Sequence, residues 1–324
     1  MQKRTTTGLS KSKRQLKIFN NFDQVGSIKN AVVTTGSFDG VHVGHKVILQ
    51  RLKNLALETG GETVLITFHP HPRKVLYPET SGKELYLINS QREKIELLRK
   101  AGLDNLIIVE FTLDFSKITS VDFVTNILLN KIHAKKIVIG FNHHFGHNRE
   151  GDYEKLHQLG IECGFEVEEI PEQDIQHETV SSTKIRKALL DGNIQKANAY
   201  LDHHYIIMGL IQSSNPVLTE IGFPSFTVKI EEESKLIPPD GVYAVTVFDE
   251  EKSYRGMCFI KKRGESSVEA LVEYYLFDNP QVLCGTSATL FFHKRIRDEK
   301  PLGTTDQLKQ QLLIDKAQID ELIF

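Results

Sequence analysis

The sequence predicts an α/β fold: a doubly wound parallel-sheet domain, followed by a small antiparallel β-barrel domain with a C-terminal helix. From Ala31 to about Leu201, short β-branched runs alternate with amphipathic helical patterns. This alternation is typical of a parallel sheet that helices cover on both faces. Beyond about residue 203, strand-like runs are joined by turn residues, with no helical pattern between them. Such a succession favours a small antiparallel barrel.

The expected elements follow in chain order. In the first part, strands are expected at 31–35, 63–68, 106–109, 136–139 and 165–167, and helical patterns lie at 47–52, 93–100, 121–129, 153–159 and 180–190. In the second part, strands are expected at 205–211, 226–230, 242–247, 268–277 and 288–293, and a last helix at 304–323 has Thr304 or Thr305 as its cap. We therefore expect a basic, disordered tail at 1–16, a first domain at 17–201 and a second domain at 202–324.

The composition limits the class of protein and its partners. The 324 residues suit two domains, and 40% apolar with 25% charged residues is ordinary for a globular protein. A net charge of −2 does not indicate a nucleic-acid partner, and no apolar run approaches the ~20 residues of a membrane span. Three widely spaced cysteines form no metal or disulfide pattern, which favours a reducing cytoplasm. We expect a cytoplasmic protein that binds small molecules, neither nucleic acid nor membrane, and its oligomeric state is left open.

The run from Gly36 to His45 (G-S-F-D-G-V-H-V-G-H) is the most informative stretch. It joins an expected strand to an expected helix and places His42 and His45 at the helix start. A helix N-terminus presents unpaired N–H groups and a positive dipole end, which suit a phosphate, and glycines let the backbone approach it. Imidazoles can donate hydrogen bonds there, charged or neutral. The H-x-G-H spacing resembles the signature of the nucleotidyltransferase superfamily; the structural alternative is a turn with two surface histidines.

A second segment, Val180–Arg186, begins another expected helix. Its serines and threonine are natural caps, which is the purely structural interpretation. Capping does not require Lys184 and Arg186 in the first turn, where the helix dipole disfavours cations. A bound polyphosphate would remove that objection, and Arg186 could hold it by paired hydrogen bonds.

Two loops after expected strands complete the candidate site. Phe68–Arg73 contains P-H-P, whose prolines fix the loop; it is either a rigid loop with exposed histidines or a substrate contact. Gly140–Arg149 contains Asn142 at the end of an apolar strand. Ligands of parallel sheets lie at the carboxyl ends of the strands, so Asn142 either faces that crevice or serves only the turn.

Taken together, these motifs resemble the bifunctional bacterial riboflavin kinase/FMN adenylyltransferase family, from about residue 17 to the C-terminus. The resemblance implies a nucleotidyltransferase first domain with FMN and Mg-ATP as substrates, and FAD and pyrophosphate as products, Mg²⁺ being the cofactor. The catalytic residues it implies are His42, His45, Asn142 and Arg186. The ATP and phosphate contacts it implies are Gly36, Ser37, Phe38, Gly40, Gly44, Ser181, Ser182 and Thr183. The FMN contacts it implies are His71, Pro72 and Asn142.

The same resemblance assigns the second domain to a riboflavin-kinase-like barrel and weakens there. The kinase candidates it implies are Ser225, Thr227, Glu273 and Arg297. Ser225 is the candidate metal ligand, and none is assigned in the first domain. The family's phosphate loop has a glycine where this chain has Ser214, and Gly-Arg where it has Leu218-Thr219. Bulky residues cannot replace glycine where a phosphate comes close.

We therefore hypothesise an FMN adenylyltransferase whose kinase module is impaired. Three alternatives remain: the ordinary bifunctional enzyme with an unusual working loop, a nucleotidyltransferase for another acceptor such as a pantetheine or nicotinamide phosphate, and a non-catalytic flavin-binding regulatory protein. For Glu273, the structural alternative is an outward-facing strand residue.

Overall fold

The computed structural model describes residues 15–141, 143–175, 178–212, 216–249, 252–262, 269–277, 284–301 and 303–323. Residues 1–14 of the expected basic tail, Asn142 and Ser214 lie outside the described residues. Contacts divide the chain into two compact units, which are described separately. The first unit comprises 1–36, 48–69 and 98–169, and the second comprises 37–47, 70–97 and 170–324. The expected domain boundary at residue 201 stays a prediction.

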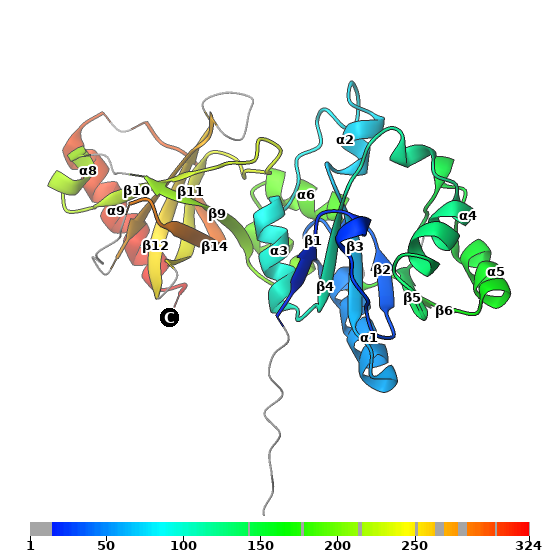
Figure 1. The fold of residues 1–324 in the computed structure, drawn as a ribbon. Coiled ribbons are helices and arrows are strands. Elements are labelled where there is room, and N and C mark those ends of the chain that lie inside the picture. The colour runs from blue at the N-terminus through cyan, green and yellow to red at the C-terminus, as the bar shows by residue number, and fades with distance from the viewer. Residues whose placement is uncertain are drawn as a thin grey trace, which may run out of the picture. The chain divides into compact units, whose positions relative to one another are not determined.

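The first unit is built on a six-stranded sheet in the order β1-β4-β3-β2-β5-β6 (Figure 1). Strands β1, β4, β3, β2 and β5 pair in parallel with their neighbours. The strands are β1 Lys17–Phe19, β2 Val32–Thr35, β3 Thr63–His69, β4 Asn105–Glu110, β5 Lys136–Gly140 and β6 Glu166–Ile170. The parallel sheet is confirmed, and the short edge strand β1 is an addition that the sequence pattern did not show.

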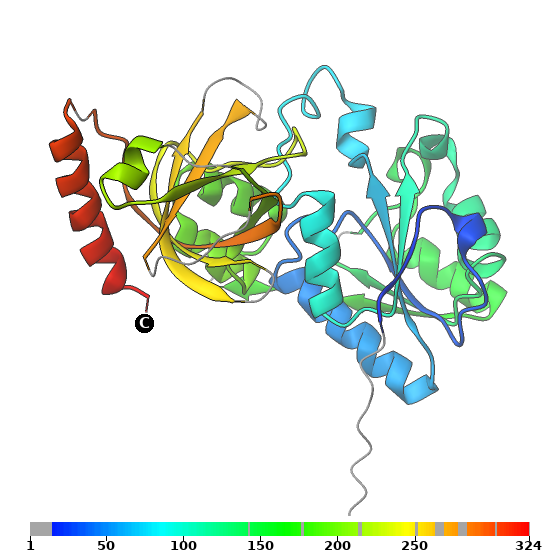
Figure 2. The same cartoon turned by 60° about the vertical axis from the view of Figure 1, so that its left-hand side comes forward.

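Alternate residues of the sheet strands pack against helices on opposite faces. Val33, Ile66 and Ile107 share one buried cluster with Leu156 of α5 and with the helical segment 120–129. Leu65 and its neighbours on the other face are equally buried, and Figure 2 shows the blue helix α1 and the green helix α5 on opposite sides of the sheet. The doubly wound architecture is therefore confirmed. The helices are α1 Val43–Thr59, α4 Ser120–Asp122, the π-helix Phe123–Leu129 and α5 Tyr153–Cys163, with 3₁₀ turns at Phe22–Gln24, Phe115–Lys117 and His147–Arg149.

The second unit contains a closed antiparallel barrel in the order β10-β13-β12-β11-β14-β9 (Figure 1). The barrel strands are β9 Tyr205–Gln212, β10 Ser225–Lys229, β11 Gly241–Phe248, β12 Ser253–Lys261, β13 Leu271–Leu276 and β14 Ser287–Arg297. The barrel fold is confirmed, with two corrections to its elements. Strand β12 was not expected, and a short helix, α8 Pro216–Glu220, follows β9, where no helix was expected.

Aromatic side chains fill the barrel interior. Tyr205, Tyr243, Tyr274 and Phe292 are fully buried there, because inward-facing residues alternate with outward-facing ones along each strand. The C-terminal helix α9 Thr305–Asp320 packs on the outside. Its N-cap is Thr304, whose hydroxyl accepts a hydrogen bond from the Gln307 backbone N–H at 3.2 Å, as expected from the sequence.

The remaining elements of the second unit carry the site motifs. They are α2 Pro72–Leu76, α3 Gln91–Lys100, α6 Ser182–Leu190, α7 Ile194–Leu201 and the small hairpin β7 Asp174–Ile175 with β8 Glu178–Thr179. Helix α3 continues into the first unit at Leu98, as α1 does at Ile48. Among the described residues, no helix combines the length and apolar character needed to cross a membrane.

Candidate functional site

The loop that leads into α1 has an unusual backbone. Phe38 and Val41 have φ values of 48° and 43°, and Gly40 has a φ of 92°. Positive φ is a genuine outlier for bulky or β-branched residues and concentrates at functional sites. A Cβ on Gly40 would lie 3.0 Å from the Ile88 side chain, so this position requires glycine on both counts.

The two motif histidines stack on each other at the start of α1. The ring centroids of His42 and His45 are 3.7 Å apart, and the Phe38 ring stacks on His45 at 4.4 Å. A Cβ on Gly44 would lie 3.3 Å from the His42 ring, so the glycine lets that ring lie against the backbone. Among the described residues, the Nδ1 atoms of both histidines are buried and have no hydrogen-bond partner, which is unusual for buried polar atoms.

Both imidazoles are neutral near pH 7. Burial lowers the pKa of His42 to about 4. The nearby Asp39 carboxylate raises this pKa, and the Arg186 charge lowers it by a smaller amount. Burial also lowers the pKa of His45 well below its ordinary value. The sequence left open whether these rings are charged; the structure gives neutral rings, each with one N–H to donate.

Asp39 organises the loop from within. The residue is 4% exposed, and its carboxylate accepts hydrogen bonds from the backbone N–H groups of Ile88 and Asn89, both at 3.2 Å. Its Oδ2 also accepts a hydrogen bond from Arg186 at 2.7 Å. Asp39 was not among the candidates, although it lies inside the G-x-F-D-G motif.

Helix α6 uses one serine as its cap and the next to contact the loop that precedes α1. Ser181 is its N-cap and accepts a hydrogen bond from the Lys184 N–H at 3.4 Å, whereas the Ser182 hydroxyl donates to the Asp39 carbonyl at 2.9 Å. Arg186 donates to the Tyr86 carbonyl at 2.9 Å. Thr183 is exposed. The fold therefore brings Ser182 and Arg186 to the histidine loop, although they lie some 140 residues further along the chain.

His71 joins the same cluster. It is the N-cap of α2, and its Nδ1 accepts a hydrogen bond from the Arg73 N–H at 3.2 Å. The structural alternative for the P-H-P segment was a rigid loop with exposed histidines. The segment instead begins a short helix, because Pro72 at the first helical position has a suitable fixed φ. Burial lowers the pKa of His71 to about 4, and Asp39, Arg186 and Lys94 all act on it.

Lys94 is a site residue that the sequence interpretation missed. It lies in α3, is 8% exposed, and donates a hydrogen bond to the Ser37 carbonyl at 3.3 Å. Burial lowers its pKa to about 8, and its charge lowers the pKa of His45 and of His71. The sequence did contain a sign of this burial: Lys94 precedes the buried Leu98 by four residues, which places both on the same face of the expected helix.

The remaining first-domain candidates belong to the first unit. Gly36 and Gly140 stand at the ends of β2 and β5, which are parallel neighbours, so both lie at the carboxyl edge of that sheet. Asn142 follows Gly140 but lies outside the described residues. Its expected role stays a prediction.

A second candidate site is a cavity of about 580 Å³ between the outer face of the barrel strands and helices α8 and α9. Ligand pockets usually measure roughly 300–1,000 Å³. Glu273 lines this cavity and is 7% exposed. It alternates along β13 with Val272 and Tyr274 of the barrel interior, so it faces outward, as the structural alternative expected, but it is buried there. Its carboxylate accepts hydrogen bonds from the Ser225 hydroxyl at 2.5 Å and the Tyr275 hydroxyl at 3.2 Å. Apolar side chains supply much of the remaining wall: Leu218, Val242, Met257, Phe259, Leu271, Leu308 and Leu312.

The two remaining kinase candidates, Arg297 and Thr227, have other contacts. Arg297 lines the cavity, but its guanidinium is bound to the buried Asp315 of α9 by hydrogen bonds of 2.7 and 2.8 Å. This pair anchors the C-terminal helix to β14. Thr227 lies opposite Glu273 in the β10–β13 register and is not among the residues that line the cavity.

The parallel sheet, the H-x-G-H loop and the appended barrel define the class: a nucleotidyltransferase enzyme with a second, barrel domain. Residues 25–184 match the family model described as FAD synthetase, and residues 201–323 match the one described as riboflavin kinase. The chain belongs to the bifunctional riboflavin kinase/FMN adenylyltransferase family, which confirms the resemblance expected from its motifs.

Relatives with that name cover nearly the whole chain. One from Buchnera aphidicola (subsp. Acyrthosiphon pisum) is 31% identical over 299 residues, which is 91% of this chain and 93% of the relative. One from Escherichia coli K12 is 30% identical over 290 residues, or 89% and 91% of the two chains. A crystal structure described as a macrolide-efflux protein from Streptococcus pneumoniae has a TM-score of 0.83 and 28% identity, and covers 94% of this chain and 98% of that one.

Proposed function

We propose that this protein is an FMN adenylyltransferase that makes FAD and pyrophosphate from FMN and Mg-ATP. An FMN phosphate oxygen attacks the α-phosphorus of ATP, the bond between that phosphorus and the bridging oxygen to the β-phosphate breaks, and pyrophosphate leaves. One observation carries the proposal: two neutral stacked imidazoles at a helix start lie in one buried cluster with Arg186 and Lys94. This cluster offers both N–H donors and positive charge to a polyphosphate.

Each residue has a role set by its chemistry. His42 and His45 donate hydrogen bonds to the α- and β-phosphates, where their fixed positions stabilise charge that develops during transfer. Arg186 and Lys94 hold the departing pyrophosphate together with Ser181, Ser182 and Thr183. The backbone of Gly36, Ser37, Phe38, Gly40 and Gly44 lets the phosphates approach. No protein nucleophile is needed, so catalysis consists of positioning and electrostatics.

The divalent ion belongs to the nucleotide in this proposal. Magnesium takes oxygen ligands and is usually bound through one or two carboxylates and substrate phosphates. Among the described residues, no group of three or more His, Cys, Asp or Glu side chains could hold a metal ion. Ser225 is fully buried, and its hydroxyl is donated to Glu273, so by itself it makes no metal site. In this proposal Mg²⁺ would be held mainly by the phosphates of ATP, whose charge it would neutralise.

The flavin phosphate is positioned by His71, Pro72 and Asn142 in this proposal. The surroundings of His71 support this role, because the charges of Asp39, Arg186 and Lys94 all act on its ring. We also place the protein in the cytoplasm, since Cys163, Cys258 and Cys284 are free thiols, as is usual in a reducing compartment.

We further propose that riboflavin phosphorylation by the barrel is impaired. Where the family has Gly-Arg, Leu218 is 4% exposed within an apolar cluster, and Thr219 follows it in the short helix α8. A helix directs its N–H groups along its own axis, and a buried leucine offers nothing to a phosphate. Under this proposal, ATP at the barrel meets a buried leucine and a threonine where the family has glycine and arginine.

A specific observation favours the second candidate, a fully bifunctional enzyme. Glu273, Ser225 and Tyr275 form a buried hydrogen-bonded group at a cavity of mixed polar and apolar lining, whose size suits a flavin ring. An oriented carboxylate of this kind could accept the proton of a riboflavin hydroxyl. The barrel would then catalyse the transfer from a nucleotide held by a different loop.

One assay separates these functions. The purified protein is incubated with Mg-ATP and either FMN or riboflavin, and the flavins are resolved chromatographically. FAD from FMN, with little FMN or FAD from riboflavin, is the expected result. FAD formed at comparable rates from both substrates would establish the bifunctional enzyme. No FAD from either would contradict the proposal and leave another acceptor or a non-catalytic flavin-binding role.

A further inference from the structure

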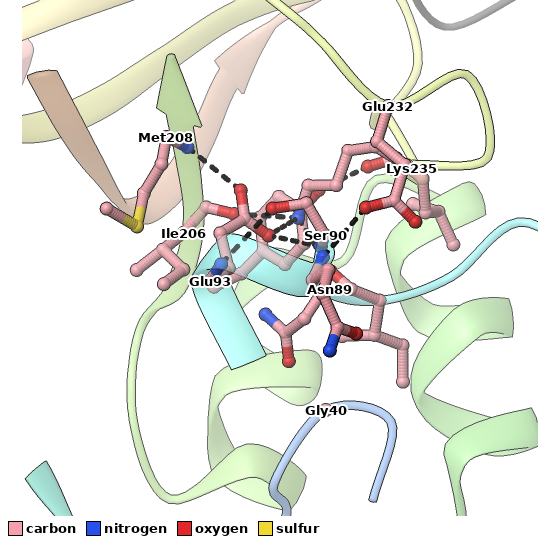
Figure 3. A network of polar contacts seen from close by, with 12 residues as sticks. Gly40, Asn89, Ser90, Glu93, Ile206, Met208, Glu232 and Lys235 are labelled. Atoms are coloured by element: carbon pink, nitrogen blue, oxygen red, sulfur yellow. Dashed lines mark hydrogen bonds and ion pairs between the residues drawn. The ribbon is translucent and has the colours of Figure 1, made fainter. Parts of the chain in front are cut away.

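A buried lysine of the barrel region touches the segment that supports the adenylyl site. Lys235 lies in the loop between β10 and β11, is 1% exposed, and forms an ion pair of 2.7 Å with Glu93 at the start of α3. Its ammonium also donates to the carbonyls of Ile88 at 2.6 Å and Ile206 at 2.9 Å. Figure 3 shows Glu93 and Lys235 facing each other, with Asn89 nearby.

Glu93 joins three elements through one carboxylate. Its Oε1 accepts a hydrogen bond from the Met208 N–H of β9 at 2.8 Å, and its Oε2 accepts one from the Ser90 N–H at 2.8 Å (Figure 3). Ser90 in turn accepts from the Glu93 N–H at 3.2 Å, which makes a capping box for α3. Lys235 thus neutralises a carboxylate that already fixes α3 against the barrel.

The segment 86–89 lies between this ion pair and the loop before α1 that contains Asp39. On one side, the Leu87 N–H donates to the Ser234 carbonyl at 2.6 Å and the Leu87 carbonyl accepts from Leu236 at 2.7 Å. On the other side, the N–H groups of Ile88 and Asn89 hold the Asp39 carboxylate.

Arg186 contacts both the segment 86–89 and Asp39. It donates to Asp39 and to the carbonyl of Tyr86. Its guanidinium therefore has its position set by a backbone segment that Lys235 holds from the opposite side. The path from Lys235 to Arg186 consists entirely of hydrogen-bonded neighbours.

We propose that Lys235 is a positioning residue for adenylyl transfer, which acts through the segment 86–89 on Asp39 and Arg186. The inference rests on the proposed role of Arg186 in phosphate binding. It gives the barrel region a part in FAD formation even where the barrel phosphorylates nothing. Lys235 itself touches no substrate in this scheme.

A double-mutant cycle tests the proposal. Lys235→Met is made in the native chain and in an Arg186→Ala chain, and kcat/KM for ATP is measured in FAD formation from FMN. If Lys235 acts through Arg186, Lys235→Met lowers kcat/KM about tenfold or more in the native chain and causes little further loss in the Arg186→Ala chain. The control is Lys316→Met, which removes a partly exposed ion pair with Asp320 and should leave kcat/KM unchanged in both.

Each other outcome has a distinct meaning. Equal losses from Lys235→Met in both chains indicate a general effect on folding and overturn the proposal, as does the absence of any loss in the native chain. An Arg186→Ala chain that forms FAD normally overturns instead the proposed role of Arg186. If Lys235→Met does not fold, the pair Lys235→Met with Glu93→Gln removes the uncompensated buried charge, and the same cycle is measured with it.

Discussion

The guanidinium of Arg186 donates a 2.7 Å hydrogen bond to the carboxylate of Asp39, across 147 positions of sequence. Both side chains are largely buried, at 13% and 6% exposed. Asp39 also receives two backbone N–H groups, so its position is fixed before a ligand binds. The arginine that the proposed function assigns to pyrophosphate is thereby held in place by the histidine motif itself.

Asp39→Asn should weaken both folding and FAD formation. The change keeps the volume but removes the charge that Arg186 faces, and breaking a buried pair usually costs about 3–5 kcal/mol. We expect a lower free energy of unfolding in urea and a kcat/KM for ATP reduced at least tenfold. Asp191→Asn is the control, since its pair with Lys187 is exposed and worth about 0–1 kcal/mol. Equal effects of the two changes would contradict the assignment.

His45→Ala should lower kcat far more than it alters FMN binding. The ring is held between Phe38 and His42, where it can donate to phosphate oxygens as charge develops. Removing one such donor costs roughly 10²–10³ in kcat in well-studied sites. Steady-state FAD formation measures kcat, and a fluorescence titration with FMN measures binding. The exposed His157 on α5 provides the control variant, and unchanged turnover of His45→Ala would refute the role of His45.

The rate of FAD formation should fall as the pH rises through about 8. Burial lowers the pKa of Lys94 to about 8, while the facing carboxylates of Asp39 and Glu232 raise it. Below that pH the ammonium is charged and can bind phosphate, and above it the charge is lost. Because kcat/KM reports the ionisation of the free enzyme, its profile for ATP should show this alkaline limb.

Substitutions at Lys94 test the origin of that limb. Arginine stays protonated throughout this range, so Lys94→Arg should remove the fall near pH 8, whereas Lys94→Met should give a low and flat profile. Phosphate groups complete their own ionisation near pH 6 and do not contribute. A limb that persists in Lys94→Met would assign it to another group.

The barrel offers a gain-of-function prediction. If Leu218 and Thr219 impair the kinase, the double variant Leu218→Gly with Thr219→Arg should raise the rate of FMN formation from riboflavin and Mg-ATP. Adding Glu273→Gln to that variant should abolish the gain, because the amide cannot accept the hydroxyl proton. The assay is chromatographic, with FAD formation from FMN as the control for folding. A native chain that already phosphorylates riboflavin rapidly would contradict the impairment.

The sequence alone determined the order and type of most elements. Helix and strand patterns depend on periods of 3.6 and 2 residues, which a short window contains, so β2–β6, α3 and α5 were found within a few residues. Helix α1 was found too, but it extends well beyond the expected pattern at 47–52. Strand β12 was missed because its sequence, S-Y-R-G-M-C-F-I-K, mixes polar residues and a glycine with its apolar ones. The H-x-G-H motif was readable for the same reason: its chemistry lies within ten consecutive residues.

Only the tertiary structure decided how that motif works. The neutral state of His42 and His45 follows from burial, and the partners of Asp39, Lys94 and Lys235 come from distant segments. Hydrogen bonds and ion pairs between such segments depend on the folded path of the chain, which local periodicity does not contain. The sequence thus determined the family and the motif proposed to bind phosphate, and the fold decided which charges surround that motif and which buried lysine lies behind it.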